Sequence, residues 1–210
     1  MLDNIECLGH STVKIKDENK VIYIDPYNIK KEYKDADFIF VTHNHYDHFS
    51  IEDIKKVRKE NTIIVITEDV YNDALELGFE DKNIVKVRPN REYQIEDIRF
   101  NTIPAYNINK KFHSRSNNWV GYILNLNNIK YYIAGDTDIT EENKNVKCDV
   151  AFLPVGGTYT MNYKEAATLA NILNPMLAIP IHYGIIVGTK EDAIHFKKLI
   201  NKKIECEIMY

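Results

Sequence analysis

Three histidines and an aspartate crowd one short segment of the chain, which reads Thr42-His43-Asn44-His45-Tyr46-Asp47-His48. The segment directly follows an apolar run, residues 38–41, that is typical of a buried strand. Neutral imidazole and carboxylate are ligands that Zn²⁺, Mn²⁺ and Fe²⁺ accept, and a tight turn after a strand can aim them at one point. A chance surface cluster is the weaker interpretation, because the segment holds three of the chain's 7 histidines. The segment therefore predicts a metal site.

Two more strand ends carry residues of the same kind. In residues 131–137 an aspartate, Asp136, follows an apolar strand and Gly135, which lets the backbone turn. In residues 179–184 a histidine, His182, stands in the same position. Alone, the aspartate is typical of a helix N-cap and the histidine of a buried core residue. Because sites in α/β proteins form at strand ends, three such ends in one chain reinforce the metal interpretation.

Composition limits the class of protein. The chain has 210 residues, and 44% of them are hydrophobic, which is enough for a packed core and excludes a disordered chain. The net charge of −4 provides no basic field for a phosphate backbone, so nucleic-acid binding is not expected. Three cysteines without a repeated spacing argue against a disulfide scaffold and a thiolate zinc cluster. The polar first residues and the short apolar stretch 176–188 predict a cytoplasmic protein without membrane insertion.

No linker interrupts the sequence, so we predict a single domain over residues 1–210. Each half has β-rich runs followed by alternating strands and helices. The first half predicts a helix from Ser50 and another over 69–77 that ends at Gly78. The second predicts a hairpin, 120–126 with 129–134, then helices over 163–173 and 191–201 and a last strand over 204–209. Residues 104–118 show neither helical nor strand periodicity, which predicts a long loop that is either functional or disordered. The pattern suggests layers of helix, sheet, sheet and helix (αββα) without excluding an open α/β sheet.

Taken together, these motifs resemble the metallo-β-lactamase superfamily. The resemblance rests on His-x-His-x-Asp-His at 43–48, Gly-Asp-Thr at 135–137 and His-Tyr-Gly at 182–184, and it extends to residues 8–11, 24–26 and 154–157. Within the superfamily the chain is most similar to the ascorbate-6-phosphate lactonase-like branch and, more distantly, to the N-acylphosphatidylethanolamine phospholipase D type. The His-x-His-x-Asp-His motif is specific for the fold but says little about the substrate, because one scaffold hosts many hydrolyses.

The resemblance implies a four-layer αββα sandwich holding two divalent metal ions, first of all Zn²⁺, with Mn²⁺ or Fe²⁺ as alternatives. By this resemblance His43 and His45 hold the first ion, and Asp136 bridges both. The second ion is held by Asp47, His48 and His182. A metal-bound hydroxide would be the nucleophile, which makes Asp47 and Asp136 the carboxylates at the catalytic centre.

One position departs from the branch. The branch usually has a histidine directly after Pro-Ala-x as the third ligand of the first metal, whereas this chain has Pro104-Ala105-Tyr106-Asn107. An amide oxygen is a weak zinc ligand compared with imidazole. His113, six positions further on, could supply the missing ligand, bind substrate or lie exposed. The tightness of the first metal site depends on which of these holds.

Several other residues are candidates for substrate contact. His10 could orient a ligand, touch substrate or be an ordinary turn residue. Asp25 could likewise orient a ligand or be an ordinary turn aspartate before Pro26. Lys111 and Arg115 flank His113 and could meet an anionic substrate, or they could be exposed loop charges. Gly156 and Gly157 offer backbone N–H groups for an oxyanion or phosphate.

We therefore predict a metal-dependent hydrolase that cleaves an ester-like bond (lactone, carboxylic ester or phosphodiester) in a small substrate. An anionic substrate is one possibility. One alternative is a nuclease-type phosphodiesterase of the same fold. The other is a non-catalytic metal-binding or sensing protein with an incomplete first site. The sequence carries no signal for the oligomeric state.

Overall fold

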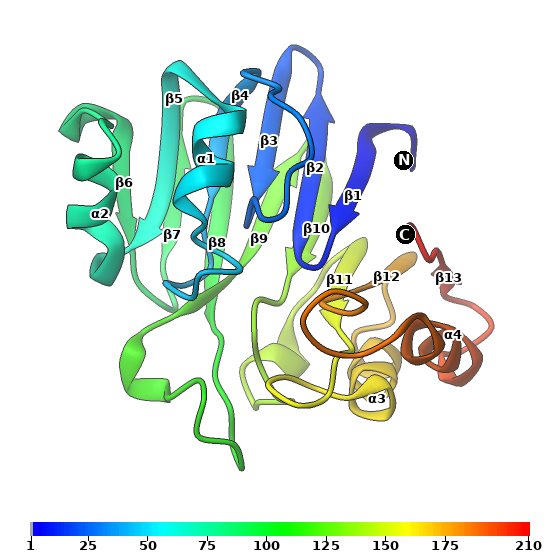
Figure 1. Ribbon diagram of the computed structural model, residues 1–210. Helices are drawn as coiled ribbons and strands as arrows, with labels where there is room; N and C mark the ends of the chain where they lie inside the picture. The colour runs from blue at the N-terminus through cyan, green and yellow to red at the C-terminus, as the bar shows by residue number, and fades with distance from the viewer. Residues whose placement is uncertain (1) are drawn as a thin grey trace. The chain divides into compact units, whose positions relative to one another are not determined.

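The computed structural model describes residues 2–210, and the chain divides into two compact units, each built around one β-sheet (Figure 1). The first unit contains the residues up to Arg88 together with Tyr210, and the second contains Pro89–Met209. The single domain expected from the sequence stays a prediction. Within the described residues, none of the helices has the length and apolar character needed to cross a bilayer.

The sheet of the first unit is mixed. Its strands follow one another in chain order: β1 (Ile5–Gly9), β2 (Thr12–Asp17), β3 (Lys20–Ile24), β4 (Ala36–Phe40), β5 (Arg58–Thr67) and β6 (Ile84–Val87). The first three pair antiparallel, and the pairs from β3 to β6 are parallel. Because β1, β3 and β4 run in the same direction, their carboxyl ends meet at one edge of the sheet.

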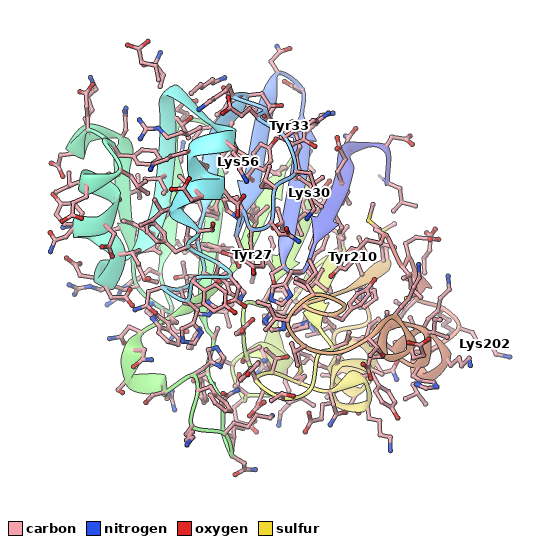
Figure 2. All side chains as sticks on the ribbon, viewed as in Figure 1. Tyr27, Lys30, Tyr33, Lys56, Lys202 and Tyr210 are labelled. Carbon is pink, nitrogen blue, oxygen red and sulfur yellow. The ribbon has the colours of Figure 1, made fainter. Side chains whose placement is uncertain are left out.

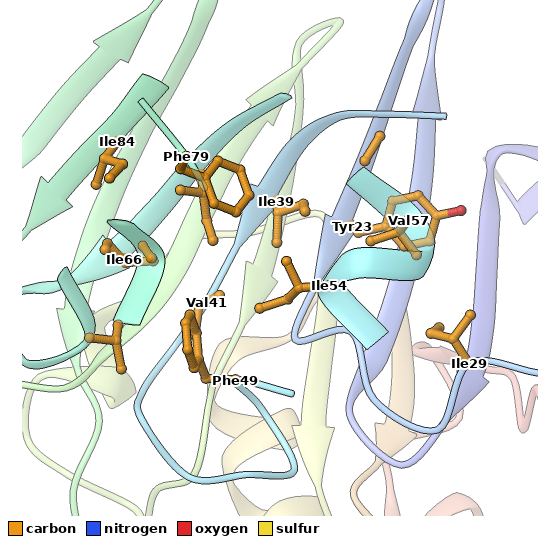
Figure 3. Packing of buried hydrophobic residues seen from close by; sticks show 14 residues of the cluster. Tyr23, Ile29, Ile39, Val41, Phe49, Ile54, Val57, Ile66, Phe79 and Ile84 are labelled. Carbon is orange, nitrogen blue, oxygen red and sulfur yellow. The ribbon is translucent and has the colours of Figure 1, made fainter. Parts of the chain in front are cut away.

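Two α-helices of this unit, α1 (Ile51–Val57) and α2 (Tyr71–Glu76), supply apolar side chains to its core. Ser50 is the N-cap of α1, as the sequence predicts, and its side chain accepts a hydrogen bond from the Asp53 N–H at 3.3 Å. Ile54 and Val57 of α1 are fully buried in the cluster that also contains Tyr23 of β3 (Figure 3). The short 3₁₀ turns are Leu2–Asn4, Glu68–Val70 and Asp81–Asn83.

Asp53 connects α1 to the loop after β3. Its carboxylate accepts hydrogen bonds from the backbone N–H groups of Asn28 and Ile29 at 2.8 and 3.0 Å. Ser50 and Lys56 also donate to it, each at 2.8 Å. Burial acts to raise the pKa of Asp53, but the hydrogen bonds from Lys56 and Ser50 outweigh it, so the pKa is lowered.

We therefore expect Asp53→Asn to lower the free energy of unfolding at pH 7 by about 1 to 3 kcal/mol. A lowered folded-state pKa gives stability that is fully present above about pH 3.9 and is lost as the pH falls through that pKa. The difference between wild type and variant should accordingly shrink in acid, which urea unfolding at pH 7 and pH 3 measures. The control is Glu52→Gln on the exposed side of the same turn. Equal stability of Asp53→Asn and wild type at pH 7 would contradict the assignment.

The sheet of the second unit is also mixed. Its order is β13 (Glu205–Cys206), β12 (Leu177–Ile181), β11 (Val150–Pro154), β10 (Ile129–Ile133), β9 (Val120–Leu126), β8 (Ile98–Pro104) and β7 (Glu92–Ile95). Strands β7 to β10 pair antiparallel, and β10 to β13 pair parallel. The carboxyl ends of β8, β10 and β12 therefore lie at one edge. The predicted hairpin is confirmed, because Asn127 and Asn128 both have positive φ, as a type I′ turn requires.

Helices α3 (Tyr163–Leu173) and α4 (Lys190–Leu199) pack against each other and against β11 and β12. Asn162 and Glu165 form a capping box at the start of α3, whose predicted bounds are confirmed. Strand β7 was not predicted from the sequence, and the last strand is shorter than predicted. The 3₁₀ turns of this unit are Arg115–Asn117 and Asn143–Asn145.

Candidate functional site

The predicted site residues of the first unit follow the carboxyl ends of β1, β3 and β4. Asp25, directly after β3, is buried, and its two carboxylate oxygens accept hydrogen bonds from the Thr42 N–H at 2.8 Å and the Thr42 hydroxyl at 2.7 Å. Asp25 Oδ2 also lies 2.7 Å from Nδ1 of His48. A carboxylate can only accept, so His48 carries its proton on Nδ1. Its Nε2 is consequently unprotonated in the neutral ring.

Thr42 fixes the neighbouring histidine by the same reasoning. Its hydroxyl has one proton, which it donates to Asp25, so it must accept from Nδ1 of His43, 2.9 Å away. Nε2 of His43 is then unprotonated in the neutral ring, and it lies 3.1 Å from Nδ1 of His45. Asp25 and Thr42 therefore turn the Nε2 atoms of two predicted ligands into electron-pair donors.

Asp47 lies between two histidines. Its Oδ2 is 2.9 Å from Nε2 of His10 and 3.5 Å from Nε2 of His48. The possible ligand atoms of these three residues lie within 4.8 Å of one another. His10 is fully buried, and its backbone carbonyl accepts a hydrogen bond at 2.5 Å from the hydroxyl of Tyr210. Tyr27 and Tyr210 are labelled in Figure 2. Of the roles open to His10, its contact with Asp47 matches that of orienting a ligand.

An aromatic pair adjoins His10 in the first unit. The Tyr27 ring lies 5.7 Å from the His10 ring and 5.9 Å from the Tyr46 ring, in edge-on arrangements. Burial raises the pKa of Tyr27, and Tyr46 and Asp47 nearby add to the effect. The Tyr27 hydroxyl therefore stays protonated at neutral pH and keeps its ability to donate a hydrogen bond.

The predicted site residues of the second unit follow the carboxyl ends of β8, β10, β11 and β12. Asp136 Oδ2 lies 3.2 Å from Nε2 of His113 and 3.1 Å from Nε2 of His182. All three residues are buried, so the interpretation of His113 as an exposed loop residue is wrong. The reason is that the loop folds back on Asn107, whose Oδ1 lies 3.0 Å from Nδ1 of His113. The Trp119 ring packs edge-on against the His113 ring at 5.6 Å.

The two basic residues beside His113 differ in their surroundings. Arg115 pairs with Glu142 at 2.6 Å, and its guanidinium lies 5.1 Å over the Tyr106 ring. Burial raises the pKa of Glu142 and the Tyr106 hydrogen bond lowers it, with a net lowering that keeps Glu142 charged. Lys111 is exposed. A role for Arg115 in binding an anion would thus compete with Glu142.

Gly156 and Gly157 form a tight turn after β11. A Cβ on Gly156 would lie 2.4 Å from the carbonyl oxygen of His182, so only glycine allows this close approach. Gly157 has a φ of +83°, and its N–H donates to the Met161 carbonyl at 3.1 Å. The Gly157 N–H is therefore already hydrogen-bonded within the turn. Gly156 allows the turn to pack closely against the strand end that carries His182.

The donor set in each unit fits divalent metal ions. Each unit brings imidazole nitrogens together with other imidazole or carboxylate ligands at 3.1 to 3.5 Å. Zinc–nitrogen bonds of about 2.0–2.1 Å in a tetrahedron place neighbouring ligand atoms about 3.3 Å apart. The Nδ1 atoms of His48, His43 and His113 contact a carboxylate, a hydroxyl and an amide oxygen, respectively. Groups of this kind hold metal-ligating imidazoles in position in proteins.

The three cysteine thiols hold their protons more tightly than usual in the metal-free chain. Burial raises the pKa of the Cys7 and Cys148 thiols to about 12 and that of Cys206 to about 11. None of the three would be ionised at neutral pH.

Sequence reasoning missed Thr42 as a functional residue, although Thr42 opens the histidine-rich segment. The available signal was a hydroxyl directly before a histidine. The contacts of this hydroxyl could not be predicted locally, because its acceptor, Asp25, lies 17 positions earlier in the chain. The role of Asn107 was also missed, because the residue was considered only as a replacement for a metal ligand and not as a hydrogen-bond partner of His113.

A β-lactamase superfamily domain model matches residues 4–182, so the chain belongs to the metallo-β-lactamase superfamily. Within it, the chain belongs to the UPF0173 metal-dependent hydrolase family. A member from Thermococcus kodakarensis is 30% identical over 218 residues, covering 98% of this chain and 95% of the relative. The chain is thus a metal-dependent hydrolase, as its sequence predicted.

Solved structures agree with this assignment. The crystal structure of a metal-dependent hydrolase from Parabacteroides distasonis has a TM-score of 0.79 and 30% identity, covering 97% of this chain and 91% of the other. Igni18, a metallo hydrolase from Ignicoccus hospitalis, has a TM-score of 0.79 at 22% identity over 98% of this chain and 94% of the other, and supports the fold alone. The predicted fold class, an α/β metallo-β-lactamase fold with two mixed sheets, is confirmed.

Proposed function

We propose that this chain binds two divalent ions, Zn²⁺ first of all, and hydrolyses an ester-like bond in a small substrate. The observation that carries the proposal is the orientation of His43 and His48, whose Nδ1 atoms contact Thr42 and Asp25 and whose Nε2 atoms face two other proposed ligands, His45 and Asp47. A lactone, carboxylic ester or phosphodiester is the proposed bond. The lactone follows from the resemblance to the lactonase-like branch.

The proposed ligands are those implied by the resemblance, with His113 added. His43, His45 and His113 hold one ion, and Asp136 is shared between the two ions. The second ion is held by the remaining residues of the predicted set, Asp47, His48 and His182. The distances of His113 and His182 from Asp136 support this assignment, and so does the contact of His48 with Asp47.

The residues around these ligands hold them in place. Divalent ions at these ligands would activate water and polarise the substrate oxygen. Asp25 and Thr42 keep the Nδ1 protons of His48 and His43, and His10 contacts the carboxylate of Asp47. A small anionic substrate could meet Lys111, which is exposed on the loop that carries His113.

The test is metal content and turnover measured on the same samples. We expect two equivalents of metal per chain after dialysis, together with hydrolysis of simple lactone, carboxylic ester or phosphodiester substrates. His113→Ala should lose one equivalent, because the first ion would keep only His43, His45 and the shared Asp136. The matched control is His195→Ala, since His195 lies on α4, where its ring packs at a tilt against the Tyr163 ring, 5.1 Å away.

Three outcomes would overturn parts of the proposal. One tightly held equivalent with no turnover would favour a metal-binding or sensing protein. Cleavage of nucleic acid in preference to small substrates would favour a nuclease-type enzyme. A full metal complement in His113→Ala would show that His113 is not a ligand.

A further inference from the structure

Asn107, the residue at which the chain departs from the lactonase-like branch, makes four hydrogen bonds inside the second unit. Its backbone N–H donates to the His113 carbonyl at 2.8 Å. Its side-chain Oδ1 accepts from the His113 N–H at 3.1 Å and lies 3.0 Å from His113 Nδ1. Its Nδ2 donates to the Tyr159 carbonyl at 2.9 Å. Three of the four contacts therefore go to one residue, His113.

These contacts decide which way the amide points. The His113 backbone N–H can only donate, so it requires the amide oxygen on its side. The Tyr159 carbonyl can only accept, so it requires the amide nitrogen on the opposite side. Both requirements give the same orientation, in which Oδ1 faces His113.

The orientation of the amide in turn fixes the proton on the His113 ring. An amide oxygen cannot donate, so Nδ1 of His113 must carry the proton in this contact. Nε2 is then unprotonated in the neutral ring, and it points at Asp136 Oδ2, 3.2 Å away. Two electron-pair donors facing each other at this distance need a positive charge between them, which a metal ion supplies and which the second proton of an imidazolium ring would also supply.

The same contacts exclude Asn107 itself as a ligand. Its Oδ1 has two lone pairs, and the two His113 donors occupy both. The amide oxygen of Asn107, considered above as a weak zinc ligand, therefore has no lone pair left for a metal ion.

We propose that Asn107 is a positioning residue that fixes His113 in its Nδ1–H tautomer and aims Nε2 at the metal. The inference rests on the proposed function, because it assumes that His113 is a ligand. On this proposal, Asn107 stands where the branch has a histidine ligand because it supports a different ligand, His113, six residues further along the chain. Partners behind metal-ligating histidines contribute about 10- to 100-fold to metal affinity.

The test compares Asn107→Leu, which keeps the approximate shape without an acceptor, with Asn107→Asp, which keeps the acceptor. In Asn107→Asp an oxygen replaces the amide nitrogen opposite the Tyr159 carbonyl, so this variant should be less stable yet bind metal as tightly as wild type. Asn107→Leu should bind one equivalent about 10- to 100-fold more weakly in competition with a chelator. Lys110→Met is the control, because it removes the Lys110–Asp138 pair from the same loop without touching His113. Metal affinity in this control should stay within about twofold of wild type.

A second measurement does not depend on metal. Long-range ¹H–¹⁵N NMR of metal-free protein at pH 8 reports which ring nitrogen of His113 is protonated. We expect the Nδ1–H tautomer in wild type and Asn107→Asp, and a shift toward Nε2–H in Asn107→Leu. If the tautomers behave in this way but wild type binds no metal, the proposed function fails and the positioning role holds. Unchanged affinity and tautomer in Asn107→Leu, or an equal loss of affinity in Asn107→Asp, would overturn the inference.

Discussion

Asp136→Asn should lower turnover by more than about a hundredfold while leaving the fold intact. Asp136 is the one carboxylate assigned to both ions, and its Oδ2 lies within 3.2 Å of two predicted histidine ligands. Replacing one oxygen by an NH₂ group removes a negative charge and an electron-pair donor from that point. Loss of a residue behind a ligand costs about 10- to 100-fold, so loss of a bridging ligand should cost more. Turnover on a substrate of the wild type and metal per chain are the two measurements.

Asp149→Asn is a suitable control for that experiment. Asp149 lies in the same unit and accepts a hydrogen bond from the Lys130 N–H at 2.8 Å, so its substitution tests the loss of a carboxylate at another strand connection. Circular dichroism should show the same secondary structure for both variants. If Asp136→Asn kept both metal equivalents and near-wild-type turnover, the bridging role would be wrong.

Removing the metal should lower the melting temperature by about 5 to 10 °C. Buried imidazoles and carboxylates gathered at strand ends are more stable with a cation than without one, so binding to the folded state adds to stability. An ion at about 100 times its dissociation constant contributes about 2.7 kcal/mol. For a chain of this length, each 1 kcal/mol corresponds to about 2–4 °C. Calorimetry before and after chelation, with metal removal verified by elemental analysis, measures the effect.

The same chelator should have little effect on Asp136→Asn, which lacks the shared ligand. This comparison separates loss of the bound ion from any direct action of the chelator. Re-addition of Zn²⁺, Mn²⁺ or Fe²⁺ one at a time should restore the melting temperature to different extents and rank the metals. An unchanged melting temperature after verified removal would show that no bound ion stabilises the fold.

Local sequence signals were sufficient for most of the fold. The capping residues Ser50 and Asn162, and the Asn127-Asn128 turn, act within a few residues, so their effect can be predicted without knowing the tertiary structure. Strand β7 could not be predicted in this way, because it is a short, partly exposed edge strand that exists through its pairing with β8. The last strand was predicted too long, because its registered pairing with β12 is limited to Glu205 and Cys206.

The candidate site was predictable only where residue type and strand end coincide. His43, His48 and Asp136 stand at such ends, and the structure places each beside another predicted ligand or its support. The position of His113 was not predictable, because the loop that carries it is closed by contacts with Asn107 rather than by any periodic pattern. The assignment of these residues as ligands stays a prediction until metal is measured.

The hydroxyl of Thr42 and the carboxylate of Asp25 hold two imidazoles at once. The orientations of the His43 and His48 rings are therefore coupled, because the Thr42 hydroxyl lies 2.9 Å from Nδ1 of His43 and 3.3 Å from Nδ1 of His48. If the two rings serve different ions, occupancy at one ion reports on the geometry at the other through this single contact. The two ions would then load as a linked pair, and a substitution at Thr42 would disturb both affinities together rather than either one separately.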